Sequence, residues 1–401
     1  MISVEEAIQR LQNNVHRQSE IEEIDLLNAT NRVLAEDVYS PINVPDFPKS
    51  AMDGYAVQSA DTLNATSDNP VSLKVIEKIY AGEYGDIKAE KNTAIRVMTG
   101  SFIPEGYDSV IKQEDTDYGS QFVKIYKPSS PQQYSCEKGE DILKGEFLFP
   151  KGTKIKSAHL GILSSIGTHK VKVLKKMKVS ILSTGSELLL PHQPLENGKI
   201  FSSTNYILAS YIKNNGLGLG SLSLVKDELK LLASRIKEEL ASCDILLTTG
   251  GVSVGEKDLL PEVMDKIGAE IIFHSIAMKP GTPVMAAKYK DKLILCFSGN
   301  PYAALANFSV LFWPVVAEFY GSQDFNLKSF KLPVKKGYLK SSKLKRYVRG
   351  KEENGFIYLE TKTHQSSILS NLIDCNIIMI QEPGEEIIEG KELEGFYLPM
   401  P

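Results

Sequence analysis

The most constraining feature of this chain is a long alternation of strand-like and helix-like segments between residues 178 and 320. Short apolar runs are each followed by a stretch in which apolar residues recur every three or four positions. The predicted strands are 178–182, 221–225, 244–248, 269–276, 283–287 and 292–297, and the predicted helices are 204–216, 227–240, 258–267 and 302–319. This alternation is typical of a parallel, doubly wound α/β sheet with helices on both faces.

Three of the predicted strands end in turns rich in glycine, serine and threonine. These turns are Ser183–Glu187, Thr248–Asp258 and Phe297–Pro301. Ligands of open α/β sheets bind beyond the carboxyl ends of the strands, and glycines with helix N-terminal N–H groups bind anions. The turns therefore predict a site for a phosphorylated ligand, although any one of these glycines alone is more often a tight turn. The residues expected to line the site are Gly185, Gly250, Gly251, Ser253, Gly255, Gly299, Asn300 and Pro301.

The turns do not match a Walker A loop or a GxGxxG fingerprint, so ordinary nucleotide hydrolysis and dinucleotide binding are disfavoured. Three acidic residues follow strand ends: Glu187, Asp227 and Asp258. A single acidic residue at such a place is usually a helix cap, but together in one crevice the three predict a Mg²⁺ site beside a phosphate. Lys279 follows another strand, and it is either a ligand for an anion or a solvated lysine.

The remaining segments differ in character from the α/β region. Residues 3–15 predict a helix with a capping box formed by Ser3 and Glu6, and residues 27–34 show a second, short helical pattern. Strands are predicted at 71–75, 94–98, 109–112 and 122–126, and the chain after Gly321 is β-rich. We therefore expect a multidomain α/β and β fold. Its predicted parts are an N-terminal domain of residues 1–45 and 140–176, a β-rich domain of 46–139, the α/β domain of 177–325 and a C-terminal β-barrel of 326–401.

Composition excludes several classes of function. The chain has 401 residues and a formal net charge of −4, which argues against nucleic acid as its main partner because phosphate backbones need a basic surface. No apolar run reaches the roughly 18 to 20 residues that span a bilayer, and the N-terminus does not resemble a signal peptide. The four cysteines form no CxxC pair. We expect a cytoplasmic protein that binds neither membranes nor nucleic acid.

Two long motifs carry a resemblance to a known family. The segment Pro45-Asp-Phe-Pro-Lys-Ser-Ala-Met-Asp-Gly-Tyr-Ala56 resembles the signature of the MoeA and gephyrin E-domain family, the molybdopterin molybdenumtransferases. The segment Thr249-Gly-Gly-Val-Ser-Val-Gly-Glu-Lys-Asp258 resembles the pterin-binding loop of the same family. Shorter matches in the same order are Met98–Gly100, Gly139–Ile142, Met278–Gly281, Gly299–Pro301 and Thr363–Ser367.

The resemblance implies a reaction, a cofactor and an assembly. Members insert molybdate into adenylylated molybdopterin and release AMP and molybdenum cofactor, with Mg²⁺ or a similar ion. It implies an elongated N-terminal domain and a homodimer, with each active cleft built from the α/β domain of one subunit and the β-rich domain of the other. Possible protein partners are the molybdopterin adenylyltransferase and the molybdenum enzymes that receive the cofactor. Carried over by motif, the metal ligands are Glu187 and Asp258, the further cleft residues are Asp53, Thr99, Asp141 and Asp227, and the molybdate pocket contains Lys279, Arg349 and Ser367.

Four positions depart from the family pattern. Thr282 stands where a second lysine is usual, Ala303 replaces a serine, Ser298 replaces a proline and Cys136 replaces a basic residue. The first two remove a cation and a hydroxyl from the expected anion pocket, and each lost charge-assisted hydrogen bond costs about 1.5–3 kcal/mol. The sequence leaves open whether molybdate or tungstate is preferred. Two alternatives also remain: a non-catalytic scaffold on the same fold, and a phosphotransfer enzyme that shares only the α/β domain.

Overall fold

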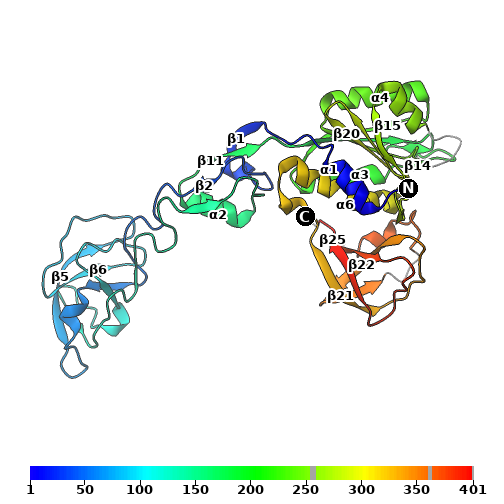
Figure 1. The fold of residues 1–401 in the computed structure, drawn as a ribbon. Helices are drawn as coiled ribbons and strands as arrows, with labels where there is room; N and C mark the ends of the chain where they lie inside the picture. The colour runs from blue at the N-terminus through cyan, green and yellow to red at the C-terminus, as the bar shows by residue number, and fades with distance from the viewer. Residues whose placement is uncertain (253–258, 360–363, 400–401) are drawn as a thin grey trace. The chain divides into compact units, whose positions relative to one another are not determined.

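The structure is a computed structural model that describes residues 1–252, 259–359 and 364–399. The chain divides into two compact units (Figure 1). The first unit comprises residues 1–35, 152–156 and 171–401, and the second comprises 36–151 and 157–170. The prediction that the chain has four domains with the stated boundaries stays a prediction.

A six-stranded sheet forms the centre of the first unit. Its strand order is β15-β12-β16-β20-β19-β17. The strands are β12 (Lys178–Thr184), β15 (Gly218–Val225), β16 (Ile245–Thr249), β17 (Glu270–His274), β19 (Met285–Tyr289) and β20 (Lys292–Phe297). All six correspond to predicted strands, but the expectation of a fully parallel sheet is wrong. β19 runs antiparallel to both neighbours, because only Lys290 and Asp291 connect it to β20 and a crossover to a parallel strand needs a much longer connection.

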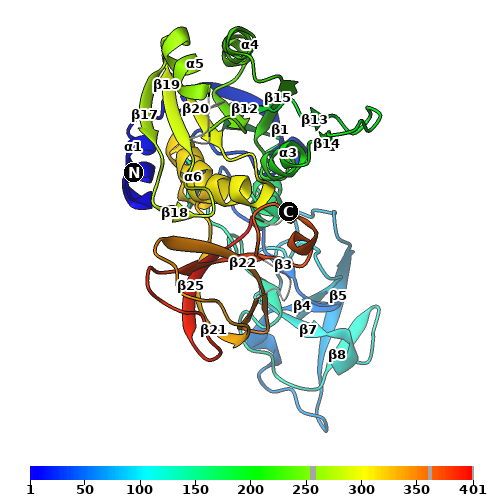
Figure 2. The ribbon, with the colours of Figure 1, turned by 90° about the vertical axis from the view of Figure 1, so that its right-hand side faces the viewer.

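Helices cover both faces of this sheet (Figures 1 and 2). One face packs against α4 (Leu229–Ser242) and α5 (Leu260–Ile267) in a common apolar core. The other face packs against α3 (Thr204–Asn214) and α6 (Pro301–Tyr320). Within the described ranges, α6 is the one helix whose length and hydropathy would suit a membrane span, and its side chains are largely buried in this core.

The N-terminal segment belongs to the same unit. Helix α1 (Val4–Gln12) packs against α6 and buries Val4, Ala7 and Leu11. One half of the predicted capping box is confirmed, since the Ser3 hydroxyl accepts a hydrogen bond from the Glu6 N–H at 3.0 Å. The Glu6 carboxylate accepts a hydrogen bond from Arg10 at 2.6 Å. The helix expected over residues 27–34 is wrong. A 3₁₀ turn at Leu26–Asn28 is followed by extended bridges at Val33 and Leu34, because those apolar residues pair with Lys154 and Val173.

The C-terminal region of the first unit is a closed five-stranded barrel, as predicted. Its strands follow the order β22-β23-β21-β25-β24, and β24 pairs back to β22. They are β21 (Ser329–Lys336), β22 (Lys345–Glu353), β23 (Phe356–Leu359), β24 (Ile377–Gln381) and β25 (Glu392–Tyr397). The short strand β18 (Met278–Lys279) joins the outer edge of β22 and so ties the α/β region to the barrel (Figure 2).

The second unit contains a five-stranded sheet in the order β7-β4-β6-β5-β8. Its strands are β4 (Gly54–Val57), β5 (Val71–Ile79), β6 (Thr93–Val97), β7 (Ser109–Lys112) and β8 (Phe122–Ile125). The four predicted strands are present, and β4 was missed because it follows a proline-rich segment. The unit also holds β2 (Val38–Tyr39), β3 (Lys49–Ser50), β9 (Ser135–Cys136), β10 (Phe147–Phe149) and α2 (Ser157–Ser165).

Minor elements complete the described chain. They are β1 (Ile21–Asp25), β11 (Lys170–Leu174), β13 (Leu188–Leu189), β14 (Ile200–Phe201) and the 3₁₀ turns Ser59–Thr62, Gln113–Asp115, Gln323–Phe325 and Ser370–Leu372. The pair β13–β14 follows directly on the end of β12. It therefore places an excursion of the chain beside the carboxyl edge of the α/β sheet.

Candidate active site

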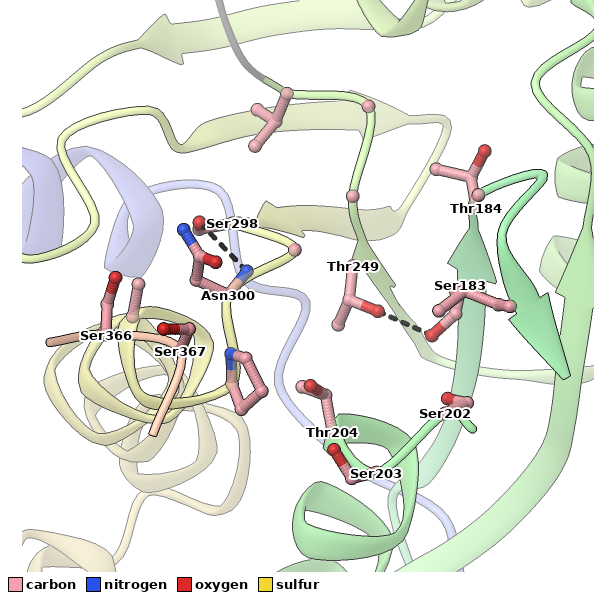
Figure 3. Close-up of a pocket in the computed structure, with 18 of the residues that line it drawn as sticks. Ser183, Thr184, Ser202, Ser203, Thr204, Thr249, Ser298, Asn300, Ser366 and Ser367 are labelled. Atoms are coloured by element: carbon pink, nitrogen blue, oxygen red, sulfur yellow. Dashed lines mark hydrogen bonds between the residues drawn. The ribbon is translucent and has the colours of Figure 1, made fainter. Parts of the chain in front are cut away.

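The three glycine-rich turns meet at one edge of the α/β sheet. They follow β12, β16 and β20, which are neighbouring parallel strands. A cavity of about 710 Å³ opens there, which we call the acidic cavity (Figure 3). Six of the predicted residues line it: Gly185, Gly250, Gly251, Gly299, Asn300 and Pro301. The predicted residues Ser253, Gly255 and Asp258 lie outside the described ranges.

Gly250 shows why glycine is needed at this edge. Its φ is +90°, a conformation that residues with a side chain rarely adopt. A Cβ atom on Gly250 would lie 2.3 Å from the carbonyl oxygen of Thr184 on the neighbouring turn. The glycine thus lets two turns approach closely, and its N–H donates to the Phe297 carbonyl oxygen at 3.1 Å, which ties this turn to the end of β20.

The charged side chains of the acidic cavity are carboxylates. Glu187 is exposed, whereas Asp227 is half-buried and accepts hydrogen bonds from the Thr184 hydroxyl and from the Ser186 N–H at 3.2 Å. Both line the cavity, and among the described residues its lining contains no lysine, arginine or histidine. The described ranges hold no group of three metal-ligating side chains. The two oxygen donors fit a hard divalent cation, and without one they would repel a phosphate.

Hydroxyl groups form much of the remaining lining, and the sequence reasoning missed them. Ser183 and Thr249 share a hydrogen bond, and Ser202, Ser203 and Thr204 also line the cavity (Figure 3). The Ser202-Ser-Thr204 run before α3 was the available signal, but it was interpreted only as a helix start. These hydroxyls offer donors and acceptors to a polar ligand.

A second cavity of about 590 Å³ adjoins the first, and we call it the basic cavity. Lys279, Arg346 and His364 line it, and its lining contains no carboxylate among the described residues. Lys279 and Arg346 are paired neighbours on β18 and β22, so their side chains emerge on the same face. Like charges directly opposite each other are destabilising, and an anion between them removes that repulsion. The two cavities share Pro280, Asn300, Ser366 and Ser367.

Arg349 has a different position from the one expected. Its side chain is fully buried and lines neither cavity. Its guanidinium donates to the carbonyl oxygens of Gln365 and Ile368, each at 3.0 Å, and lies 4.2 Å from the centre of the Tyr302 ring. Arg349 therefore supports the loop that carries Ser366 and Ser367. Arg346, three residues earlier, is the arginine of the basic cavity.

The four unusual positions also have defined places. Ala303 and Ser298 line the acidic cavity. The Thr282 hydroxyl donates to the carbonyl oxygen of Met278 at 2.5 Å, and Thr282 lines neither cavity. Cys136 is half-buried and pairs with Lys49 in the second unit. The oxyanion affinity expected to fall with Thr282 and Ala303 stays a prediction.

The remaining predicted residues lie in the second unit. Asp53 accepts hydrogen bonds from the Thr99 N–H at 2.7 Å and the Thr99 hydroxyl at 2.8 Å. These two bonds hold the pKa of the Asp53 carboxyl below its usual range. Asp141 is exposed in the turn after Gly139, and its N–H donates to the Val44 carbonyl oxygen. The structure thus brings Asp53 and Thr99 together.

Two family models match most of the chain. A model described as MoeA N-terminal region (domain I and II) matches residues 2–167, and a model described as probable molybdopterin binding domain matches residues 180–318. Together they cover nearly all of the second unit and most of the α/β region.

Curated relatives and a solved structure extend the similarity. The chain is 35% identical over 352 residues to a molybdopterin molybdenumtransferase from Staphylococcus aureus (strain MSSA476), covering 87% of this chain and 83% of that protein. It is 33% identical over 390 residues to the protein of the same name from Bacillus subtilis (strain 168), covering 96% and 90%. The crystal structure of a molybdopterin biosynthesis MoeA protein from Pyrococcus horikosii matches with a TM-score of 0.82 and 30% identity over 99% of both chains.

Proposed function

Because the chain belongs to the molybdopterin molybdenumtransferase family, we propose that it inserts molybdate into adenylylated molybdopterin and releases AMP and molybdenum cofactor. The observation that carries this proposal is the pair of adjoining cavities with opposite charge. A substrate with phosphates that need a cation suits the acidic cavity, and a tetrahedral oxyanion suits the basic one. The reaction requires both kinds of group to be bound side by side.

The acidic cavity supports binding of the adenylate part of the substrate. Backbone at Gly251 and the first turn of α6 offer N–H groups to phosphate oxygens. Glu187 and Asp227 would hold Mg²⁺, with Asp258 as the third predicted ligand. When bound, such an ion polarises P–O bonds and stabilises the charge that develops as the phosphoanhydride breaks. The Thr184 hydroxyl and the Ser186 N–H keep the Asp227 carboxylate oriented towards that role.

The basic cavity supports binding of molybdate. Lys279 and Arg346 supply the positive charge, and Ser366 and Ser367 supply hydroxyls on the wall shared with the acidic cavity. Because the wall is shared, molybdate is held next to the substrate while the carboxylates of the other cavity stay away from it. Insertion would form bonds from molybdenum to the two dithiolene sulfurs, while one oxo group of molybdate leaves as water with the two thiol protons. A second water would add to the phosphoanhydride phosphorus and so release AMP.

Molybdate-dependent AMP release from adenylylated molybdopterin is the decisive test. We expect AMP to accumulate only when molybdate and a divalent ion are both present. If AMP is released at the same rate with and without molybdate, the chain is a phosphohydrolase. If the chain binds the pterin tightly but releases no AMP, it is a scaffold. Substituting tungstate for molybdate in the same assay determines which oxyanion this chain prefers.

We further propose a cytoplasmic homodimer in which Asp53, Thr99 and Asp141 of one subunit complete the active site of the other. The motif match and the Asp53–Thr99 hydrogen bonds support these residues as a unit. An adenylyltransferase would supply the substrate, and molybdenum enzymes would receive the product. In mixed dimers of Asp53→Ala and Glu187→Ala chains, we expect activity to recover partly. No recovery in verified mixed dimers would indicate a site built within one subunit.

A further inference from the structure

The turn at residues 278–282 forms the wall between the two cavities. Lys279 and Pro280 line the basic cavity, and Pro280 and Gly281 line the acidic cavity. The turn holds Gly281 at a φ of +95°, which residues with a side chain rarely adopt. The position of the Lys279 ammonium in the basic cavity therefore depends on what fixes this turn.

Asn307 fixes the turn from behind. It lies on α6, one helical turn after Ala303, and its side chain is fully buried. Its Nδ2 donates to the carbonyl oxygen of Gly281 at 2.9 Å and contacts Met278 Sδ at 3.3 Å. A Cβ atom on Gly281 would lie 2.4 Å from the same Nδ2, so the amide and the turn are in close contact.

The amide oxygen of Asn307 lowers the stability of the fold. This Oδ1 is buried and has no hydrogen-bond partner in the described structure. Turning the amide around would place Oδ1 against the Gly281 carbonyl oxygen, so the observed orientation is fixed. A buried unpartnered acceptor destabilises the fold, and an apolar side chain of similar size would avoid that penalty. The bond to Gly281 is the gain that offsets it.

Thr282 closes the turn from its other end. Its hydroxyl donates to the carbonyl oxygen of Met278 at 2.5 Å. This is the position where the family usually has a lysine, so here the side chain of residue 282 serves the backbone and leaves Lys279 as the cation of the turn. Two side chains thus hold the carbonyl groups on either side of Lys279 and Pro280.

We propose that Asn307 and Thr282 are positioning residues that place Lys279 for oxyanion binding in the basic cavity. The proposal rests on the proposed function, because molybdate is the anion that Lys279 would bind there. Asn307 touches no ligand and acts through the Gly281 carbonyl, while Thr282 acts through the Met278 carbonyl. In this way the buried Asn307 side chain on α6 fixes the position of the Lys279 ammonium in the basic cavity.

The main test compares Asn307→Leu with Ser309→Ala. Both remove a buried polar atom without a partner from α6, but Ser309 has no bond to the turn. We expect Ser309→Ala to melt at or above the wild-type temperature. Asn307→Leu should melt close to the wild-type temperature, because the gain from removing the unpartnered Oδ1 is offset by the loss of the donor to the Gly281 carbonyl. We expect only Asn307→Leu to raise the molybdate concentration for half-maximal AMP release, by about tenfold. A lower melting temperature with unchanged molybdate dependence would overturn the proposal, since that is the signature of a purely structural residue.

A double-mutant cycle tests whether Asn307 acts through Lys279. In a Lys279→Met background, Asn307→Leu should have little further effect on molybdate dependence, whereas additive effects would contradict the coupling. If Asn307→Leu does not fold, Thr282→Val provides the same test and Thr282→Ser should restore the wild-type value. Molybdate binding by calorimetry gives an independent measurement. A wild-type chain that binds molybdate without releasing AMP would refute the proposed function and leave the positioning of Lys279 testable.

Discussion

The acidic and basic cavities share a wall but differ in every charged side chain that lines them. Glu187 and Asp227 line the larger cavity, and Lys279 and Arg346 line the smaller one. Had these four groups faced one another, they would form ion pairs and lose most of their attraction for a ligand. The comparison shows that a few uncharged residues separate the carboxylates from the cations. A cation and an oxyanion can therefore be bound next to each other.

The largest expected effect concerns the acidic cavity. We expect Glu187→Gln to lower turnover by roughly 100-fold, because it removes a charge that stabilises the cation and hence the transition state. The dependence on Mg²⁺ concentration should weaken, while the molybdate concentration for half-maximal AMP release should stay the same. Glu196→Gln, an exposed change in the same loop outside the cavity lining, is the matched control. Wild-type turnover in Glu187→Gln would break the assignment of the acidic cavity.

Changes in the basic cavity should alter the dependence on molybdate and leave the dependence on Mg²⁺ unchanged. We expect Lys279→Met and Arg346→Met each to raise the half-maximal molybdate concentration about tenfold to a hundredfold, the value of one charge-assisted hydrogen bond. Their Mg²⁺ dependence should be unchanged. Lys345→Met is the control, because Lys345 is adjacent to Arg346 but pairs with Glu5 at 2.8 Å and Glu382 at 3.3 Å. If all three variants raise the half-maximal molybdate concentration equally, the net charge of the protein, and not the basic cavity, determines molybdate dependence.

Arg346 and Arg349 of β22 should differ in how much each contributes to the stability of the fold. Arg349→Met should destabilise the fold by about 2–4 kcal/mol, because Arg349 is fully buried and its loss leaves the carbonyl groups of Gln365 and Ile368 without their donor. Arg346→Met should change the free energy of unfolding by less than about 1 kcal/mol. Chemical denaturation of both variants measures the difference. The same loss of stability in both would contradict the division into a supporting and a ligand-binding arginine.

The smallest expected effect concerns a carboxylate of the second unit. The Thr99 bonds lower the pKa of Asp53, so Asp53 should stay ionised below the pH at which an ordinary aspartate takes up a proton. Its contribution to stability is complete above the ordinary pKa and is lost as the pH falls through the lowered folded-state pKa. NMR titration of the side-chain carboxyl measures this, and Thr99→Val should move the midpoint upwards. Thr99→Val keeps the backbone N–H bond, so an unchanged midpoint would exclude the Thr99 hydroxyl as a cause of the lowered pKa.

Much of the architecture was predictable because its signals are local. Alternating strand and helix patterns identified all six strands of the α/β sheet, and the three glycine-rich turns had to meet once their strands were parallel neighbours. The helix expected at residues 27–34 failed because the bridges of Val33 and Leu34 to distant residues outweighed a weak local preference. Parallel pairing failed at β19 because the two-residue connection to β20 overrides the pattern of the strands.

The sequence by itself determined the fold class, the family and the residues that follow each strand. Only the tertiary structure decided which cations line the basic cavity. The motif match in the sequence pointed to Arg349. Side chains alternate along a strand, so a separation of three residues turns Arg346 and Arg349 to opposite faces of β22. β18 pairs beside Arg346 and brings Lys279 next to it, whereas the buried Arg349 faces the loop of residues 365–368. Which face of β22 lines the cavity depends on pairing with residues far away in the sequence, and no local sequence pattern encodes that pairing.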